Sequence, residues 1–431
     1  MTSTETLLEF AAAPHLLPPA VRADALRLLA DTLTVGAAGS TAPGADAVLA
    51  VARGWGDGNA ARLLGSDERL PTASTAFVNG FRIHCLEWDP VHEPAVVHAL
   101  SVVTAALGAA IDRQGGCGAD EALVALAVGV EVASLLGVAA TSPLTFFRPA
   151  TAGLIGGALA IARLEGLARA QFDDVLGLAY SQCAGTMQAH VEGSIALPLQ
   201  VASAARAAVA TVDMVKAGLT GPHDVIEGPF GYFKLFEHGD IAPHIGALGR
   251  EWRISEISTK PYPSGRASHA VLSTLSAVQL AADDVQWIEV FVPPLIKRLV
   301  GRPMIADMTP AYARLCLPLL SALMLSDGCI DPRRFVPETF SDPAIIALAG
   351  RVVIALDDNP DPNALSPQRM VITRASGAVS EHHIPHTLGS PEAPLTPAQS
   401  ATKRDLARTL GAHPHDPRLF DDPLAYFTEP Q

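Results

Sequence analysis

Charged residues are scarce in this sequence, and positive charge is the scarcer sign. Aspartate and glutamate number 44 against 30 lysines and arginines, so the formal net charge is −14, and charged residues make up only 17% of the chain. No run of basic residues occurs. Because nucleic-acid-binding proteins concentrate positive charge on one surface, we expect no nucleic-acid partner.

Cysteine is rare as well. The five cysteines lie far apart and form no Cys-x-x-Cys pair, so neither a disulfide framework nor the usual zinc spacing is visible. The first residues, 1–5, place no positive charge ahead of an apolar stretch, as a secretory signal would. These two observations predict reduced thiols and a cytoplasmic protein.

Long uninterrupted hydrophobic runs are missing. A membrane-spanning helix needs roughly 20 consecutive apolar residues, and the nearest candidate, 123–140, is interrupted by Glu131. We therefore expect a buried helix, with Glu131 as a paired structural carboxylate, and no membrane partner. The sequence also has no Gly-x-Gly-x-x-Gly motif or phosphate-binding loop, so no cofactor is expected.

Hydrophobic residues, in contrast, make up 49% of the 431 positions. A chain of this length is too long for one simple core and predicts two domains. Segments from residue 98 onward have the spacing of helices that are apolar on nearly every side: 98–111, 121–136, 151–164, 175–187 and 195–217. Because such helices are buried by other helices, they predict a large all-helical domain.

The pattern changes near residue 253. Short segments with strand-like composition or alternation follow, at 253–258, 284–292, 351–356 and 370–373. A helix is expected over 268–282, and Ser376-Gly377 suits a hairpin turn. These elements predict a separate α+β domain.

The predicted fold class is therefore mainly α with an α+β lid. The lid is assigned to residues 255–390. Pro397 opens a last helix, expected to run through Leu410 and to pack back on the helical domain. The helical domain is accordingly assigned to residues 1–254, completed by 391–431.

The segment 77–98 holds the densest chemistry in the chain, with three histidines and three carboxylates. An apolar helix is expected to run up to Asp89, and a second one to start near His98. Between them, Pro90 and Pro94 prevent a regular helix. Ionisable side chains on an irregular loop between buried helices are typical of a small-molecule site.

Several ordered blocks of the sequence carry a family resemblance. They are 31–39, Asn79-Gly80 with His84, Glu87, Asp89 and His98, the block 147–153, Lys260-Pro261-Tyr262-Pro263 with His269, and Phe340-Ser341-Asp342-Pro343. In their order and spacing these blocks resemble the MmgE/PrpD family. That family includes 2-methylcitrate dehydratase, cis-aconitate decarboxylase and iminodisuccinate epimerase.

The resemblance implies a fold, a substrate class and a reaction type. It implies a helical domain and a smaller lid with the active site between them, and a homodimer. The implied substrates are small di- and tricarboxylates. The implied chemistry is removal of a proton next to a carboxylate, followed by loss of water, loss of carbon dioxide or reprotonation.

The chain also departs from the family's pattern. Pro90 and Val91 replace an expected Asp-Thr, and Arg148 stands where the family has a histidine. Leu197 aligns with a second family lysine, and Leu319 lies near the position of a late tyrosine. These departures leave dehydration, decarboxylation and epimerisation open.

Four residues are candidates for catalysis. His98 can act as acid or base near neutral pH, and it matches a family histidine. Lys260 matches the family lysine before Pro-Tyr-Pro, and a partly desolvated lysine near other cations can exchange protons. Asp89 and Glu87 are expected to orient His98 or to bind the substrate. Their alternative roles are structural, with the histidine capping a helix and the carboxylates bonding loop amides.

Candidates for substrate binding come from several segments. Arg148 and Arg266 suit carboxylates, because the planar guanidinium pairs with both oxygens. His269 lies one turn from Arg266 and is expected to face the same cleft. The remaining candidates for substrate binding are His84 and His92, which lie close to Asp89 in sequence. Their spacing matches no established metal motif, so no metal is assigned.

The sequence thus predicts an enzyme: a cofactor-independent lyase, of dehydratase or decarboxylase type, acting on a small polycarboxylate. The alternative is an isomerase or epimerase that uses the same proton-transfer site. Two further hypotheses are a metal-dependent hydrolase built on His84, Asp89, His92 and His98, and a dimeric binding protein without catalysis.

Overall fold

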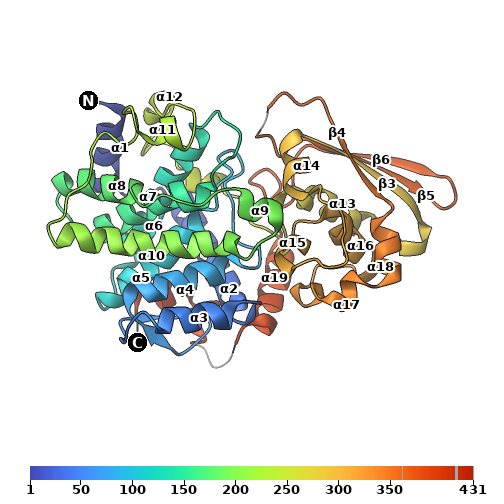
Figure 1. Ribbon diagram of the computed structural model, residues 1–431, viewed down its shortest axis with the longest axis horizontal. Helices are drawn as coiled ribbons and strands as arrows, with labels where there is room; N and C mark the ends of the chain where they lie inside the picture. The colour runs from blue at the N-terminus through green and yellow to red at the C-terminus, as the bar shows by residue number, and fades with distance from the viewer. Residues whose placement is uncertain (362, 413–415, 431) are drawn as a thin grey trace.

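The computed structural model describes residues 1–361, 363–412 and 416–430. The chain folds into a large helical lobe and a smaller lobe that carries a sheet (Figure 1). Each lobe has its own hydrophobic core. One core is built from residues 7–257 with 407–427, and the other from 267–372 with Leu144. The large domain is therefore discontinuous in sequence.

The centre of the large domain is α7 (Arg148–Leu164), which packs against α5 (Ala99–Arg113), α6 (Ala119–Val138) and α10 (Ala196–Lys216). Close packing of α6 on α7 requires glycine, because a Cβ at Gly156 would lie 2.2 Å from the carbonyl oxygen of Gly129. The remaining helices of this domain are α1 (Ser3–Ala12), α2 (Pro19–Ala38), α3 (Ala45–Arg53), α4 (Thr72–His84), α8 (Phe172–Tyr180), α9 (Gln188–Glu192), α11 (Tyr232–Leu235) and α12 (Ala242–Ile245). The predicted large helical domain is confirmed, but it is not entirely helical, because β1 (Ala61–Arg62) and β2 (Arg69–Leu70) form a short antiparallel pair in it.

Helix α6 is long and apolar enough to cross a membrane by composition, but 89% of its most apolar window is buried by the rest of the protein. It is a core helix of the large domain. Glu131, in its middle, accepts hydrogen bonds from the backbone N–H and the guanidinium of Arg253. The prediction that Glu131 is a paired structural carboxylate is confirmed.

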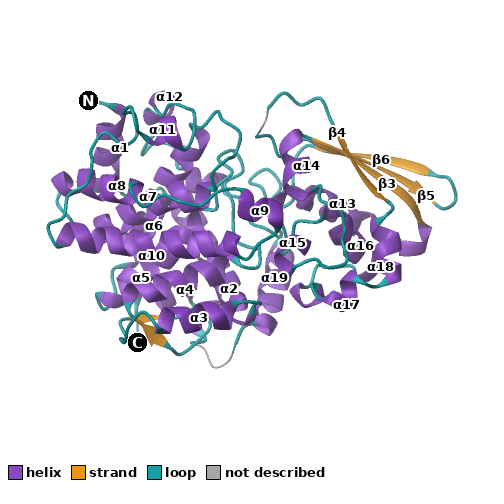
Figure 2. Cartoon of the chain, in the orientation of Figure 1, coloured by secondary structure: helices purple, strands orange, loops and turns teal. Residues whose placement is uncertain are grey.

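The smaller lobe is an α+β unit whose sheet has the strand order β4-β3-β5-β6 (Figure 2). The strands are β3 (Val285–Val292), β4 (Val352–Leu356), β5 (Gln368–Arg374) and β6 (Val379–Ile384), with β3 parallel to β4 and antiparallel to β5. Along β3, Val285, Ile288, Val290 and Val292 are buried, whereas Trp287 is 47% exposed. Alternation of this kind gives the strand one covered face.

The helices of this lobe are α13 (His269–Val278), α14 (Pro294–Val300), α15 (Pro310–Ala313), α16 (Leu317–Asp327), α17 (Pro337–Phe340) and α18 (Pro343–Ala349). Helix α16 packs against α13 and α18. The last predicted helix is also present, as α19 (Pro397–Leu410), and it returns to pack on α2 of the large domain. Two short helices, α20 (Arg418–Asp421) and α21 (Pro423–Thr428), follow.

Three local predictions are wrong. The segment 253–258 is a short 3₁₀ helix, Arg253–Glu256, rather than a strand, because Arg253 is held by Glu131 on α6. The helix expected to reach Asp89 ends at His84. The helix expected over 175–187 ends at Tyr180. Tertiary contacts and loop geometry decide these ends, and residue spacing does not report them.

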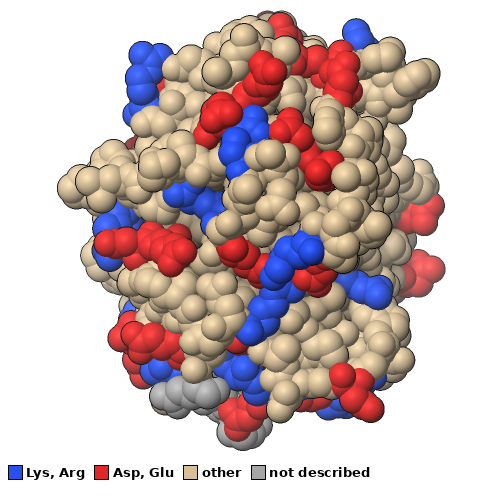
Figure 3. All heavy atoms as spheres, turned by 90° about the vertical axis from the view of Figure 1, so that its left-hand side faces the viewer, with Lys and Arg blue, Asp and Glu red and all other residues tan. Residues whose placement is uncertain are grey.

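The surface of the large domain mixes charges of both signs. On the face turned away from the smaller lobe, lysine and arginine side chains lie beside aspartate and glutamate side chains and form no continuous basic area (Figure 3). Interspersed charge of this kind gives no electrostatic footprint for a polyanion on that face.

Candidate active site

The loop between α4 and α5 is irregular but tightly held. Two non-glycine residues in it, Glu87 and Val96, have positive φ angles of 54° and 48°. Such conformations cost energy and persist where the surroundings impose them, often at functional sites. An antiparallel bridge between Val91 and Ser258 ties the loop to the start of the smaller domain.

Asp89 is the hub of a buried cluster in this loop. Its Oδ2 lies 2.9 Å from Nδ1 of His84 and 3.0 Å from Nδ1 of His98, and it also accepts the hydroxyl proton of Ser101. Its Oδ1 is buried and has no hydrogen-bond partner among the described residues. Asp89 thus orients both imidazoles, and its Oδ1 can still accept a further hydrogen bond.

The two imidazoles differ in electrostatic character. Burial opposes the charged form of His84, but Asp89 and Glu87 outweigh it, so the pKa of His84 is raised. For His98, burial is the largest effect and Asp89 only partly offsets it, so the pKa of His98 is lowered. Neighbouring groups whose pKa values are pushed apart are suited to separate acid and base roles.

His98 is the member of this cluster that reaches the cavity. Its side chain is 13% exposed, whereas those of His84 and Asp89 are fully buried. With Nδ1 bonded to Asp89, its Nε2 has no hydrogen bond to any described residue. A carboxylate on one ring nitrogen leaves the other as a neutral, oriented base, which is the arrangement that general-base catalysis requires.

Lys260 joins the cluster from the opposite side. Its Nζ, fully buried, donates to the backbone oxygen of Glu87 at 2.8 Å and approaches Oε2 of Glu87 at 3.3 Å. Burial would raise the pKa of Glu87, but the charges of His84 and Lys260 lower it to about 2. A glycine at residue 389 is needed beside this lysine, because a Cβ there would lie 1.9 Å from the Thr259 oxygen.

A small cavity of about 60 Å³ lies between the two domains. Its charged and polar lining consists of Glu87, His98, Arg148, His190 and Arg266, and the rest is apolar. Because sites for small molecules usually measure about 300–1,000 Å³, the cleft is closed in this structure. A substrate enters only when its walls separate.

Arg148 and Arg266 line the cavity, but their donors are already committed. Arg148 donates to both oxygens of Glu237 and to the carbonyls of Ala95 and Ser142. Arg266 donates to Glu93, with further bonds to the carbonyls of residues 387 and 388. Binding a substrate carboxylate on either would require the release of these partners.

Replacing Arg148 with methionine should lower the free energy of unfolding by about 3–5 kcal/mol, because Glu237 would be left buried without its partner. Denaturant unfolding measures the loss. Adding Glu237→Gln should recover most of it. A loss below about 1 kcal/mol for Arg148→Met would show that the pair is not structural.

His92 and His269 do not reach the cavity. His92 donates from Nε2 to Glu256 at 2.8 Å, while its Nδ1 accepts the backbone N–H of Ala95. His269 is fully buried beside Ser264, and burial holds its pKa well below the ordinary value. Their contacts position loops of the two domains, and neither histidine faces the cleft.

The positions that depart from the family pattern have different surroundings. Leu197 lies in the cavity wall and makes that part of it apolar. Val91 also lines the cavity, while its backbone bridges to Ser258. Leu319 belongs to the buried core of the smaller domain. The cleft therefore has a polar end at His98 and a hydrophobic flank.

Sequence analysis missed His190, an imidazole in the cavity wall. It sits in the short helix α9, is 6% exposed, and accepts hydrogen bonds from Arg302 of the smaller domain. The only signal in the sequence was a histidine between apolar residues, which more often indicates a core position. Its location at the domain boundary could not be read from spacing.

Stability should fall as the pH drops from about 6.5 to 4, because His190 resists protonation. Burial, aided by Arg302, lowers its pKa to about 4. Between these pH values the His190 imidazole is protonated in the unfolded chain but not in the folded protein, since an unfolded histidine has a pKa of about 6.5. His190→Gln should flatten the fall in unfolding free energy, measured by denaturant titration at several pH values.

The matched control is His223→Gln, since His223 is 64% exposed. This variant should keep the wild-type slope. Equal slopes for wild type and His190→Gln would contradict the assignment.

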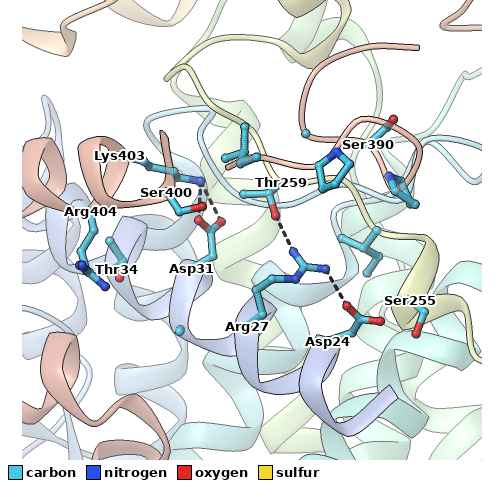
Figure 4. Close-up of a pocket in the computed structure, with 16 residues that line it drawn as sticks. Asp24, Arg27, Asp31, Thr34, Ser255, Thr259, Ser390, Ser400, Lys403 and Arg404 are labelled. Atoms are coloured by element: carbon cyan, nitrogen blue, oxygen red, sulfur yellow. Dashed lines mark hydrogen bonds and ion pairs between the residues drawn. The ribbon is translucent and has the colours of Figure 1, made fainter. Parts of the chain in front are cut away.

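A roomier cavity of about 490 Å³ lies between α2, the segment around Thr259 and α19 (Figure 4). Two of its three cations are paired, Lys403 with Asp31, and Arg27 with Asp24 and the Thr259 hydroxyl. The third, Arg404, has no ion pair or hydrogen bond with any described residue. Lys403 also donates to the backbone oxygen of Trp88. The smaller cavity contains the oriented imidazole of His98, so we take it as the candidate active site. In the wall of the larger cavity, the Lys403–Asp31 pair supports the loop at Trp88.

Comparisons with known proteins identify the family of the chain. The family model for the MmgE/PrpD N-terminal domain matches residues 7–244, and that for the MmgE/PrpD C-terminal domain matches residues 262–415. Human cis-aconitate decarboxylase is 26% identical over 344 residues, which cover 76% of this chain and 70% of that protein.

Fungal proteins are also similar. A cis-aconitate decarboxylase-like protein of Aspergillus oryzae is 27% identical over 62% of this chain and 59% of its own length. Cis-aconitate decarboxylase of Aspergillus terreus is 27% identical over 61% of this chain and 57% of its own length. The matches thus cover less than two thirds of the fungal proteins. Since the two family models together span most of the sequence, the chain belongs to the MmgE/PrpD family.

Proposed function

We propose that this protein is a lyase that acts on a small di- or tricarboxylate and transfers a proton at the carbon next to a carboxylate. Membership of the MmgE/PrpD family and relatives named as cis-aconitate decarboxylases support an enzyme of the lyase class. The observation that carries the proposal is the neutral imidazole of His98, held by Asp89 and facing a closed cleft.

In this proposal Nε2 of His98 exchanges the proton with the substrate. Asp89 fixes the ring and stabilises the imidazolium that forms, as a buried carboxylate does for a catalytic histidine. Lys260 and His84, whose pKa is raised by Asp89 and Glu87, lie against these two carboxylates and offset their negative charge where an anionic substrate would bind. Closure of the lid excludes water, which strengthens these interactions.

The test is turnover of a panel of citrate-like and aconitate-like acids by the purified protein in D₂O, followed by NMR. We expect one of two results. Loss of carbon dioxide should deliver one deuteron to the carbanion carbon of the product, whereas loss of water should send the proton removed beside the carboxylate to solvent and leave the alkene without a new label. His98→Ala should abolish the product and any label. Deuterium exchange into substrate without any elimination would replace the lyase with an isomerase.

A metal-dependent hydrolase is the second candidate, because His84, Asp89 and His98 each place one ligand atom within 4.8 Å of the others. His92, the fourth predicted ligand, is engaged with Glu256 and lies outside this group. Both imidazoles direct Nδ1 at one carboxylate oxygen, which is the geometry of hydrogen bonds. We expect turnover to survive dialysis against EDTA and elemental analysis to find no stoichiometric metal. Loss of activity that zinc restores would favour the hydrolase.

A further inference from the structure

The lid presents two arginines beside the cavity, at the end of α14. Leu299 and Val300 of this turn form part of the cavity wall. Arg298 and Arg302 flank them, four residues apart in sequence. Neither arginine lines the cavity itself, but Arg302 bonds His190, which does, and both arginines act electrostatically on that imidazole. Their positive charges therefore lie behind the cavity wall at His190.

Arg302 has a buried donor with nothing to bind. Its Nη2 donates to the backbone oxygen of His190 at 2.8 Å and lies 3.4 Å from Nδ1 of the same residue. Its Nη1 is buried and has no hydrogen-bond partner among the described residues. A buried unpaired donor costs free energy, so such groups usually mark a site that a ligand or water completes.

Arg298 is exposed and makes no hydrogen bond or ion pair with any described residue. Partial burial of the Arg298 guanidinium and the nearby charge of Arg148 lower its pKa, although the residue as a whole is exposed, and burial lowers the pKa of Arg302. Neither arginine has a carboxylate partner among the described residues, so their positive charges are not neutralised locally. Positive charges arranged in this way attract an anion.

We propose that Arg302 and Arg298, with His190, form the subsite that holds a second carboxylate of the substrate, remote from the carbon at which His98 acts. This inference rests on the proposed function, since it assigns a further carboxylate of the same substrate. It also follows from the occupancy of Arg148 and Arg266, whose donors already bind Glu237 and Glu93. Binding at lid arginines links substrate capture to closure of the cleft.

The experiment compares Arg302→Met, Arg298→Met and Arg302→Lys with wild type. The probe is tricarballylate, an unreactive saturated tricarboxylate, titrated by calorimetry; kcat and KM are measured on the substrate that the enzyme turns over. Arg302→Met should raise the Kd and KM by roughly 30-fold, as loss of one partner of a buried charge pair does. The kcat should change by less than about threefold. Arg298→Met should weaken binding less, because this side chain is exposed.

The control is Arg369→Met, which removes a lid arginine on β5 that pairs with exposed Glu381. It should leave Kd and KM at wild-type values. Arg302→Lys should recover part of the lost affinity, since lysine restores the positive charge but not the planar pair of N–H donors of a guanidinium. Recovery of this kind separates binding from a purely structural effect, and thermal unfolding confirms that each variant is folded.

The inference is overturned if Arg302→Met binds tricarballylate as wild type does, or if Arg369→Met weakens binding equally. Calorimetry keeps this result independent of turnover. A wild type that binds tricarballylate through Arg302 but converts no acid in the panel would retain the subsite and refute the proposed reaction. Turnover of an acid in the panel, with no effect of Arg302→Met on binding, would support the proposed reaction and refute the subsite.

Discussion

Asp89→Asn should lower kcat by roughly 10³-fold or more, with little change in KM. The carboxylate accepts hydrogen bonds from His84, His98 and Ser101. Asparagine would replace one of the two carboxylate oxygens with an N–H donor. His98 would then turn its basic nitrogen toward residue 89 and away from the cleft. Replacement of the aspartate that orients a catalytic histidine costs about 10⁴-fold in a well-studied serine protease.

Steady-state kinetics measure this loss, and Asp112→Asn provides a matched control. Asp112 is also buried, and it pairs with Arg62 at the opposite end of α5 from His98. Its replacement should lower stability but leave kcat within about twofold. An Asp89→Asn enzyme that keeps more than a tenth of wild-type kcat would show that Asp89 only supports the fold.

Lys260→Met should lower kcat by roughly 100-fold or more. The fully buried ammonium neutralises Glu87 and bonds its backbone oxygen. Without it, Glu87 would stay charged in the cavity wall and repel an anionic substrate, or would take up a proton. The same change should lower the free energy of unfolding by about 3–5 kcal/mol, because one charge of a buried pair remains unpaired.

A double variant separates the two effects. Lys260→Met combined with Glu87→Gln removes the unpaired charge, so most of the lost stability should return, while kcat should stay low. Lys216→Met, at a lysine whose side chain is 50% exposed, is the control for both measurements. If the double variant recovers kcat together with stability, Lys260 has no role beyond holding Glu87.

The broad architecture could be predicted because it depends on periodicity. Continuous apolar helices indicated the large domain, and the alternation along 284–292 indicated β3, which the structure places in the sheet with its alternate residues buried. The helix from Pro397 to Leu410 was predicted with its observed ends, because proline at its start fixes the first turn. The segment 253–258 was misjudged because its conformation depends on Glu131, which lies in a distant helix.

Parts of the candidate site could be predicted for a different reason. His98, Asp89 and Glu87 lie within one short loop, so their proximity followed from sequence distance alone. Lys260 was singled out by the resemblance, and the structure brings its ammonium to Glu87. His190 and Arg302 could not be found in this way, because they come from separate domains and meet only in the folded protein.

The support that Lys403 gives to the loop has a consequence for how the protein is made. Lys403, on the helix that returns to the large domain, holds the backbone of Trp88, one residue before Asp89. During translation the loop therefore emerges long before the side chain that supports it. A ribosome-bound chain that ends before residue 403 would carry the histidines of the cluster without their support, so active protein would form only late in synthesis.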